Sequence, residues 1–95
     1  MINIEERRRT LAAIVGDNVA RLRKERGWSQ ERLAREIEMT RETVRAIETG
    51  KSLPEVPTLE RLAAAFELAD FGELLRYSGD RDTASQLSGL DAAAA

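Results

Sequence analysis

Polar side chains between positions 41 and 49 are spaced to lie on one face of a helix. At about 100° per residue, Val44 and Ile47 would define the buried side of that helix. The opposite side would then expose four candidate base-reading residues, which are Arg41, Glu42, Arg45 and Ala46. Arginine presents two parallel donors that match guanine, glutamate accepts from cytosine, and the alanine methyl group packs against thymine. The alternative is a solvated face on which Glu42 pairs with Arg45, which would stabilise the helix by only about 0.2–0.5 kcal/mol.

A second set of side chains has the chemistry to contact phosphate, and it consists of Gln30, Thr40, Thr43 and Lys51. Gln30 is expected in the first turn of a helix, where free backbone N–H groups and the helix dipole attract an anion. Three of these residues also have purely structural interpretations. Gln30 would be a capping or solvent-facing amide, Thr40 a helix cap, and Lys51 a solvated loop residue.

The composition excludes most enzymatic and metal-binding chemistry. The 95 residues include no cysteine and no histidine, which removes thiolate ligands, the commonest general base and the commonest metal ligand. Any catalysis would depend on carboxylates or lysines, which are scattered over the chain. We therefore expect a protein that is not an enzyme and that holds no metal and no cofactor. No apolar run approaches the roughly 20 residues of a membrane span, so we also expect a cytoplasmic protein with no membrane association.

The distribution of charge is more informative than its sum. The net charge of the chain is −2, which by itself counts mildly against binding to a polyanion. Residues 1–55 carry twelve Arg and Lys against ten Asp and Glu, whereas residues 56–95 carry three against seven. The basic side chains therefore lie in the same half as the candidate site. Affinity would depend on individual arginines and helix N-termini and not on a broad basic surface.

Apolar residues recur at three- and four-residue spacing throughout, which predicts an all-α fold. Asn3 followed by Glu6 is typical of a capping box that opens a first helix, which would end near Arg26 before Gly27. Gly16 either breaks this helix or is accommodated within it at a cost of about 1 kcal/mol relative to alanine. Residues 1–16 are accordingly expected to be an N-terminal helix or helical extension.

Two short helices should follow at a steep angle to each other. Ser29 is a good N-cap for a helix over residues 30–37, with Trp28 and Leu33 spaced as a hydrophobic staple. Thr40 is a candidate N-cap for a helix over residues 41–49 that stops at Gly50. So tight a connection predicts a helix-turn-helix.

The remaining elements complete a compact bundle of about five helices, with the helix-turn-helix domain over residues 17–77. Pro57 suits the first turn of a fourth helix after the loop that Pro54 marks. Asp70 and Glu73 have the spacing of a capping box for a fifth helix that ends near Tyr77. Residues 78–95, rich in Gly, Asp, Ser and Ala, are expected to be a flexible C-terminal tail.

The order of these residues resembles the lambda-repressor/Cro-like helix-turn-helix family, also called the XRE family. The resemblance covers about sixty residues, and it rests on residues 21–31 (RLRKERGWSQE), 33–34 (LA), 47–51 (IETGK) and 58–65 (TLERLAAA). The family usually has glycine in the turn before its third helix, where this chain has Glu38. We therefore expect a strained or rearranged turn there, at a cost on the order of 1 kcal/mol.

The resemblance also implies roles for individual residues. The family places its third helix in the major groove, and its base-contacting positions coincide with the four residues identified above. It implies that the Gln30 side chain clamps the DNA backbone. Arg23 and Glu48 resemble a partly buried pair that locks the first helix to the third, which is a structural role.

We therefore expect a sequence-specific double-stranded DNA-binding transcription regulator. Its most favoured form is a dimeric repressor of phage, plasmid or bacterial origin that binds a palindromic operator. The homodimer surface would come from the fifth helix (Leu74, Leu75 and Tyr77) or from an N-terminal stripe (Ile2, Ile4 and Leu11). The alternative is an antitoxin or anti-repressor type of protein-interaction module with secondary DNA binding, whose protein partner would bind the C-terminal tail.

Overall fold

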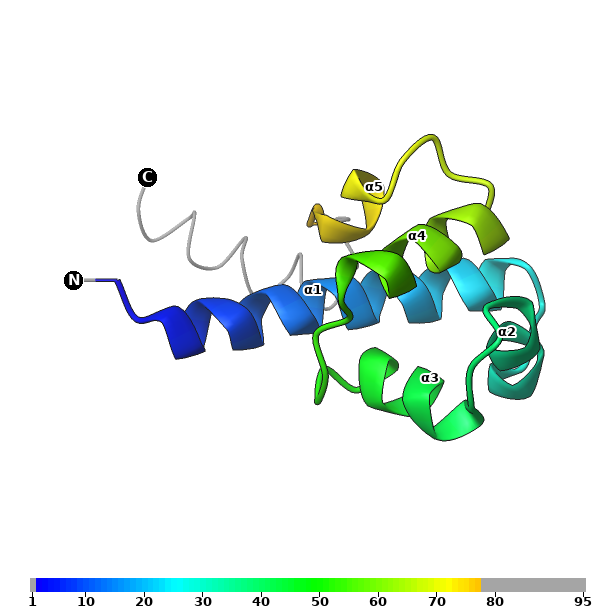
Figure 1. Ribbon diagram of the computed structural model, residues 1–95, viewed down its shortest axis with the longest axis horizontal. Helices are drawn as coiled ribbons and strands as arrows, with labels where there is room; N and C mark the ends of the chain where they lie inside the picture. The colour runs from blue at the N-terminus through cyan, green and yellow to red at the C-terminus, as the bar shows by residue number, and fades with distance from the viewer. Residues whose placement is uncertain (1, 78–95) are drawn as a thin grey trace.

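The computed structural model describes residues 2–77, and this part of the chain contains five α-helices (Figure 1). No residue of that part lies in a strand, so the predicted all-α bundle is confirmed. The predicted C-terminal tail, residues 78–95, lies outside the described residues. The helices are α1 (Ile4–Glu25), α2 (Gln30–Glu36), α3 (Arg41–Glu48), α4 (Val56–Ala65) and α5 (Gly72–Leu75).

The first helix is continuous from Ile4 to Glu25 and passes through Gly16 without a break. The side-chain oxygen of Asn3 accepts a hydrogen bond from the backbone N–H of Glu6 at 3.1 Å, as the capping prediction required. Every residue from 2 to 10 is exposed, and Figure 1 shows this first stretch of α1 extending beyond the other helices. The part of α1 that belongs to the packed bundle therefore begins at Leu11.

A single apolar core joins all five helices. Each helix contributes side chains that are almost fully buried, and burial of one such side chain stabilises the fold by roughly 1.5–3 kcal/mol relative to leaving it exposed. Pro57 lies in the first turn of α4, as predicted, and the buried face of this helix includes Leu59, Leu62 and Ala63. The core includes Val15 and Val19 of α1, Leu33 of α2, Val44 and Ile47 of α3, Leu59 and Leu62 of α4, and Leu74 of α5, together with Ile37 and Phe66.

Local capping sets the starts of α2 and α3 where the sequence predicted them. The Ser29 hydroxyl accepts from the backbone N–H of Arg32 at 3.0 Å, and the Thr40 hydroxyl accepts from that of Thr43 at 3.1 Å. Gly27 closes the end of α1 with a φ of 69°. These bonds satisfy backbone groups that have no partner within the helix, so each helix begins where its cap is.

Glu38, in the turn between α2 and α3, has a φ of 57°. This left-handed conformation is strained for any residue with a Cβ, as predicted for this position. We expect Glu38→Gly to stabilise the protein by about 0.5–1 kcal/mol, because the relief of strain exceeds the extra entropy that glycine loses on folding. Urea denaturation measures the change. Glu60→Gly, in the middle of α4, should instead destabilise by about 1 kcal/mol. If both glycines destabilise, Glu38 is not strained.

The fifth helix is shorter than predicted. A capping box at Asp70 should have opened a helix that ended near Tyr77, but α5 spans only Gly72–Leu75. The Asp70 carboxylate accepts from the backbone N–H of Gly72 at 2.7 Å, and the Glu73 carboxylate accepts from that of Ala69 at 3.1 Å. Both carboxylates therefore bind backbone N–H groups at the start of α5, and the helix begins at Gly72, after Asp70.

Asn18 explains where α5 ends. Its side chain is fully buried, and its Nδ2 donates at 2.8 Å to the backbone carbonyls of both Leu74 and Arg76. Arg76 is extended (ψ 141°) and cannot continue the helix. One amide on α1 thus satisfies carbonyls that a longer helix would have used internally. The sequence analysis missed this residue, because nothing local marks an asparagine on a helix as a tertiary partner.

Candidate nucleic-acid interface

The third helix presents a polar face to solvent along its whole length. Val44 and Ile47 are 1% and 2% exposed, which confirms the predicted buried side. Three of the four predicted base readers, Arg41, Glu42 and Arg45, are exposed. The fourth, Ala46, is half-buried. The structure thus brings these four side chains together on the side of α3 that faces away from the core.

Two hydroxyl groups meet at the start of α3. The side-chain oxygens of Thr40 and Thr43 lie 3.0 Å apart, and Thr40 also caps the helix. Thr40 is exposed and Thr43 is half-buried. Capping uses one acceptor position of a hydroxyl group, which still has a donor and a second lone pair. Thr40 can therefore cap α3, while one hydroxyl proton of the Thr40–Thr43 pair is left to donate to an anion.

The end of α3 leads directly to Lys51. Gly50 has a φ of 74°, and the backbone N–H of Lys51 donates to the carbonyl of Ala46 at 3.0 Å. The Thr49 hydroxyl donates to the carbonyl of Arg45 at 2.8 Å. Lys51 is exposed, and its backbone is tied to the last turn of α3. Its position relative to the helix is therefore set by main-chain bonds.

A partly buried ion pair joins α1 to α3. Arg23 donates from Nε and Nη2 to the two carboxylate oxygens of Glu48 at 2.6 and 3.0 Å, and from Nη1 to the carbonyl of Trp28 at 2.8 Å. The two side chains are only 12% and 6% exposed. The hydrogen bond to Glu48 raises the pKa of Arg23 above its ordinary value, despite partial burial. The structure thus brings together the two residues that the family resemblance paired.

Gln30 is part of the same network. Its side-chain amide donates to Oε1 of Glu48 at 3.1 Å, and the residue is half-buried. Glu48, the last residue of α3, therefore contacts both the first residue of α2 and Arg23 of α1. The sequence analysis assigned Gln30 to phosphate or to capping and missed this contact. A contact between residues 18 positions apart on different helices leaves no local pattern.

Gly16 allows α1 and α3 to approach each other at the same place. A Cβ atom built there would lie against the backbone carbonyl oxygen of Ile47 and 2.9 Å from that of Glu48. Real Cβ atoms almost never come that close to another heavy atom. The glycine in α1 is therefore a requirement of helix packing, and it sets the position of the last turn of α3.

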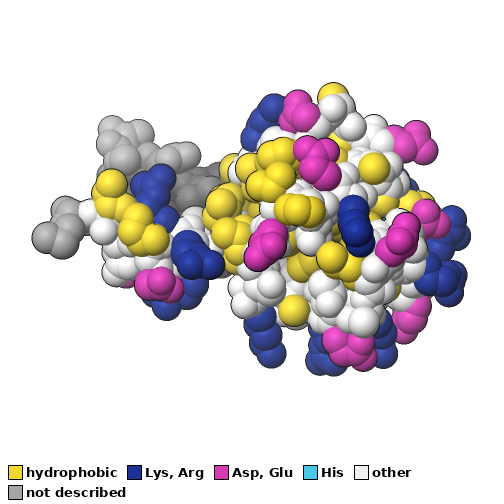
Figure 2. Space-filling view, viewed as in Figure 1, with side chains coloured by type: hydrophobic (Ala, Val, Ile, Leu, Met, Phe, Trp, Pro, Cys, Tyr) yellow, Lys and Arg dark blue, Asp and Glu magenta, His cyan; other side chains and the backbone are white. Residues whose placement is uncertain are grey.

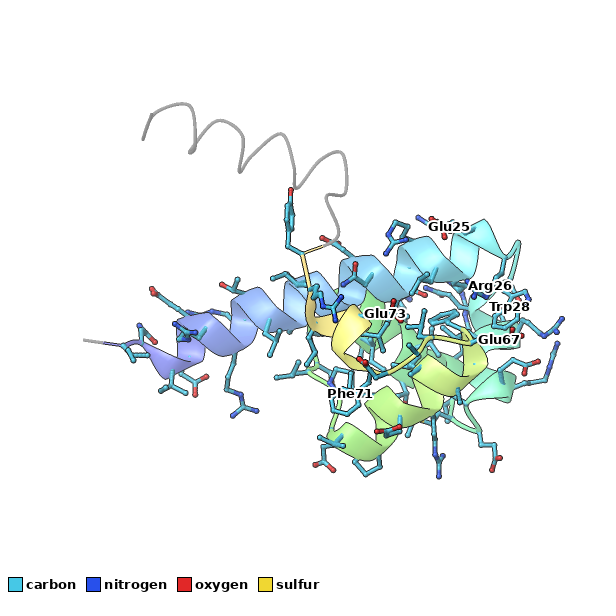
Figure 3. The ribbon with its side chains drawn as sticks, turned by 90° about the horizontal axis from the view of Figure 1, so that it is seen from above. Glu25, Arg26, Trp28, Glu67, Phe71 and Glu73 are labelled. Carbon is cyan, nitrogen blue, oxygen red and sulfur yellow. The ribbon has the colours of Figure 1, made fainter. Side chains whose placement is uncertain are left out.

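An aromatic cluster holds the start of α2 against the end of α4. Trp28 stacks on Phe66 with a centroid distance of 6.0 Å, and the guanidinium groups of Arg26 and Arg32 lie over the rings of Phe66 and Trp28 at 5.1 and 5.0 Å. Figure 3 shows Arg26 and Trp28 beside each other near Glu67, which follows α4. Each such contact adds about 0.5–1.5 kcal/mol beyond simple burial. Together they fix the position of α2.

A second ion pair, exposed to solvent, joins α2 to α3. Glu31 in the first turn of α2 lies 3.1 Å from Nε of Arg41, the first residue of α3. A hydrogen bond to its own backbone N–H lowers the pKa of Glu31 first, with smaller lowering contributions from Arg41, Ser29 and Arg35 against an opposing desolvation effect. The carboxylate is therefore ionised at neutral pH. The sequence analysis did not identify Glu31.

The surface around α2 and α3 carries both signs of charge. Figure 2 shows Lys and Arg side chains interspersed with Asp and Glu over the region where Figure 1 places these helices. Individual basic side chains, and not a uniform basic patch, are therefore available to a polyanion. Among residues 2–77, no cluster of three or more His, Cys, Asp or Glu has the arrangement of a metal site. No helix in that range is long and apolar enough to span a membrane.

The helix-turn-helix family HTH_3 matches residues 19–74, which is more than half of the chain. The chain belongs to the HTH_3 family. The match contains the whole of α2 through α4 and the Arg23–Glu48 pair. As an HTH_3 protein the chain is a DNA-binding transcription regulator and not an enzyme, which confirms the prediction at that level of detail.

Two solved structures resemble this HTH_3 domain. A hypothetical transcription factor, NHTF, from Neisseria is 33% identical with a TM-score of 0.68, and the match covers 77% of this chain and 83% of that one. An HTH_3 family transcriptional regulator from Vibrio cholerae is 25% identical with a TM-score of 0.65. That second match covers 70% of this chain but only 37% of the Vibrio protein. No curated protein sequence matches the chain.

Proposed function

We propose that this protein is a dimeric repressor that reads a palindromic operator by inserting α3 into the major groove of double-stranded DNA. The observation that carries the proposal is the exposed face of α3, which groups two arginines, a glutamate and a small apolar side chain. The residues assigned to base edges are Arg41, Glu42, Arg45 and Ala46. Those assigned to phosphates are Gln30, Thr40, Thr43 and Lys51.

The rigidity of the third helix supports this assignment. Direct readout requires side chains to meet base edges with good geometry, because each bidentate contact contributes about 1–3 kcal/mol of discrimination. Glu48 ties the end of α3 to both α1 and α2. The Thr40 cap defines its beginning. The helix is therefore held at both ends while its polar face remains exposed.

A dimer supplies what one short helix lacks. A single recognition helix contacts only a few base pairs, whereas two helices about 34 Å apart read two half-sites of a palindrome. Leu74 is 0% exposed and belongs to the core, so this residue cannot contribute to the dimer surface that was predicted on the fifth helix. Ile2 and Ile4 are 67% and 61% exposed, which favours the N-terminal stripe.

Selection from a random pool of duplexes tests the proposal. The wild-type protein should enrich a two-fold symmetric motif, and the Arg41→Ala/Arg45→Ala variant should fail to enrich it. Absence of enrichment by the wild type at low salt would contradict sequence-specific binding. It would favour a protein-interaction module, the antitoxin or anti-repressor type.

Single substitutions should separate base contacts from phosphate contacts. Arg45→Ala should weaken operator binding by about 1–3 kcal/mol and relax the preference at one base pair per half-site. Lys51→Ala should weaken binding to all duplexes about equally and reduce the salt dependence by about one phosphate contact per subunit. Fluorescence anisotropy at several salt concentrations measures both. An equal loss on operator and unrelated DNA for Arg45→Ala would remove it from the base readers.

A further inference from the structure

The ion pair between Glu31 and Arg41 bridges the two helices of the helix-turn-helix on their solvent side. The side chains are 53% and 55% exposed, and the oxygen-to-nitrogen distance is 3.1 Å. Two other exposed ion pairs, Arg21–Glu25 and Arg32–Glu36, each lie within one helix at i,i+4 spacing. The Glu31–Arg41 pair therefore links the start of α2 to a candidate base reader on α3.

Glu31 is held in place independently of Arg41. The residue lies in the first turn of α2, whose beginning is set by the Ser29 cap and whose buried residues belong to the core. Arginine has a long side chain with about 2 kcal/mol of rotamer entropy. Glutamate has the shorter side chain of the two, so Glu31 restricts the direction of Arg41.

The ion pair involves one particular nitrogen of the Arg41 guanidinium group, and this choice determines which donors remain available to DNA. Glu31 is paired with Nε, which leaves the two terminal Nη groups at the end of the guanidinium fork. That end still presents two parallel donors, one from each Nη, which match the O6 and N7 atoms of guanine. An unrestrained arginine on the same helix could turn to a phosphate instead, a contact that carries no sequence information.

We propose that Glu31 is a specificity-determining residue, which holds Arg41 by Nε so that its Nη edge faces a base and not the DNA backbone. This inference rests on the proposed function of α3. The negative charge of Glu31 also repels phosphates, so it disfavours non-specific binding to duplexes of any sequence. Glu31 acts through Arg41 and is thus a positioning residue.

The test compares Glu31→Gln with Glu36→Gln by fluorescence anisotropy on the selected operator and on an unrelated duplex. Glu36 is a matched control, because it lies on the same helix and pairs with Arg32 at 2.8 Å. For Glu31→Gln we expect the ratio of operator to unrelated affinity to fall about fivefold, the upper end for an exposed pair. Glu36→Gln should change both affinities by the same factor and leave the ratio unchanged. Equal changes in the ratio for both variants would overturn the proposal.

A double-mutant cycle assigns the effect to Arg41. In an Arg41→Gln background, Glu31→Gln should no longer lower the ratio, because the residue that it positions is gone. A fall of the same size in that background would show that Glu31 acts by another route and would overturn the proposal. A melting temperature close to that of the wild type for Glu31→Gln excludes a purely structural cause.

The outcomes also separate this proposal from the function on which it rests. If the wild type binds operator and unrelated DNA equally, the proposed function fails, and the role of Glu31 fails with it. If the wild type discriminates and Glu31→Gln discriminates as well as it does, only the role of Glu31 is overturned.

Discussion

Gly16→Ala should destabilise the protein by about 1–3 kcal/mol, the usual cost of forcing extra atoms into a packed interior. The new methyl group would meet the backbone carbonyls of Ile47 and Glu48 at contact distances that real Cβ atoms do not show. Backbone atoms cannot swing aside as a flexible side chain would, so α1 and α3 must separate. Helix propensity favours alanine by about 1 kcal/mol, and we expect packing to outweigh it. Urea denaturation followed by circular dichroism measures the net effect.

Gly27→Ala is the matched control for that substitution. Gly27 has a φ of 69°, and a Cβ built there meets nothing within 4 Å. Alanine at this position should cost about 1 kcal/mol through backbone strain alone and should leave the position of α3 unchanged. Gly16→Ala should in addition weaken operator binding, because it displaces the end of α3. A Gly16→Ala protein at least as stable as the wild type would show that α1 and α3 are not in close contact there.

Glu48→Ala should destabilise the protein by about 3–5 kcal/mol, because it leaves the charge of Arg23 partly buried without its partner. Arg23 is only 12% exposed, and it donates two hydrogen bonds to Glu48. The substitution also removes the acceptor of the Gln30 amide. A small domain is stable by about 5–15 kcal/mol, so this loss would take a large share of the total. Thermal and urea denaturation both measure it.

Two further variants define what Glu48 contributes. Glu36→Ala removes an exposed glutamate from an ion pair that is 39–46% exposed, and it should cost no more than about 1 kcal/mol. Replacing both partners, as in Arg23→Met/Glu48→Leu, should recover much of the stability lost in Glu48→Ala, because no charge is then left unpaired. A Glu48→Ala protein within about 1 kcal/mol of the wild type would show that solvent reaches Arg23 freely.

The comparison of α3 and α5 shows what kind of information the sequence contains. The ends and buried face of α3 follow from the Thr40 cap, from Gly50 and from the spacing of Val44 and Ile47, all between positions 40 and 50. The same reasoning failed for α5, because Asn18 binds carbonyls 56 and 58 positions away in the sequence. Capping and periodicity are local effects, whereas the length of α5 depends on a partner from another helix.

The candidate site likewise combines features that the sequence predicted with contacts that only the structure revealed. The exposed face of α3 could be predicted from the sequence, because helix geometry alone determines which residues lie opposite Val44 and Ile47. The resemblance to a known family supplied the Arg23–Glu48 pair. Neither approach identified the Gln30–Glu48 contact or the Glu31–Arg41 pair. Both contacts join α2 to α3, and they form only once the two helices are packed at a particular angle.

The sequence by itself therefore determined an all-α fold, the positions of α1 to α4 and the polar face of α3, whereas the family resemblance indicated the turn strain at Glu38. Each of these results from interactions between residues that are close along the chain. Only the tertiary structure decided why α1 contains Gly16, which carboxylate pairs with Arg41 and how Glu48 joins α3 to α2. These features depend on the distances between helices, and core packing sets those distances through residues far apart in the sequence.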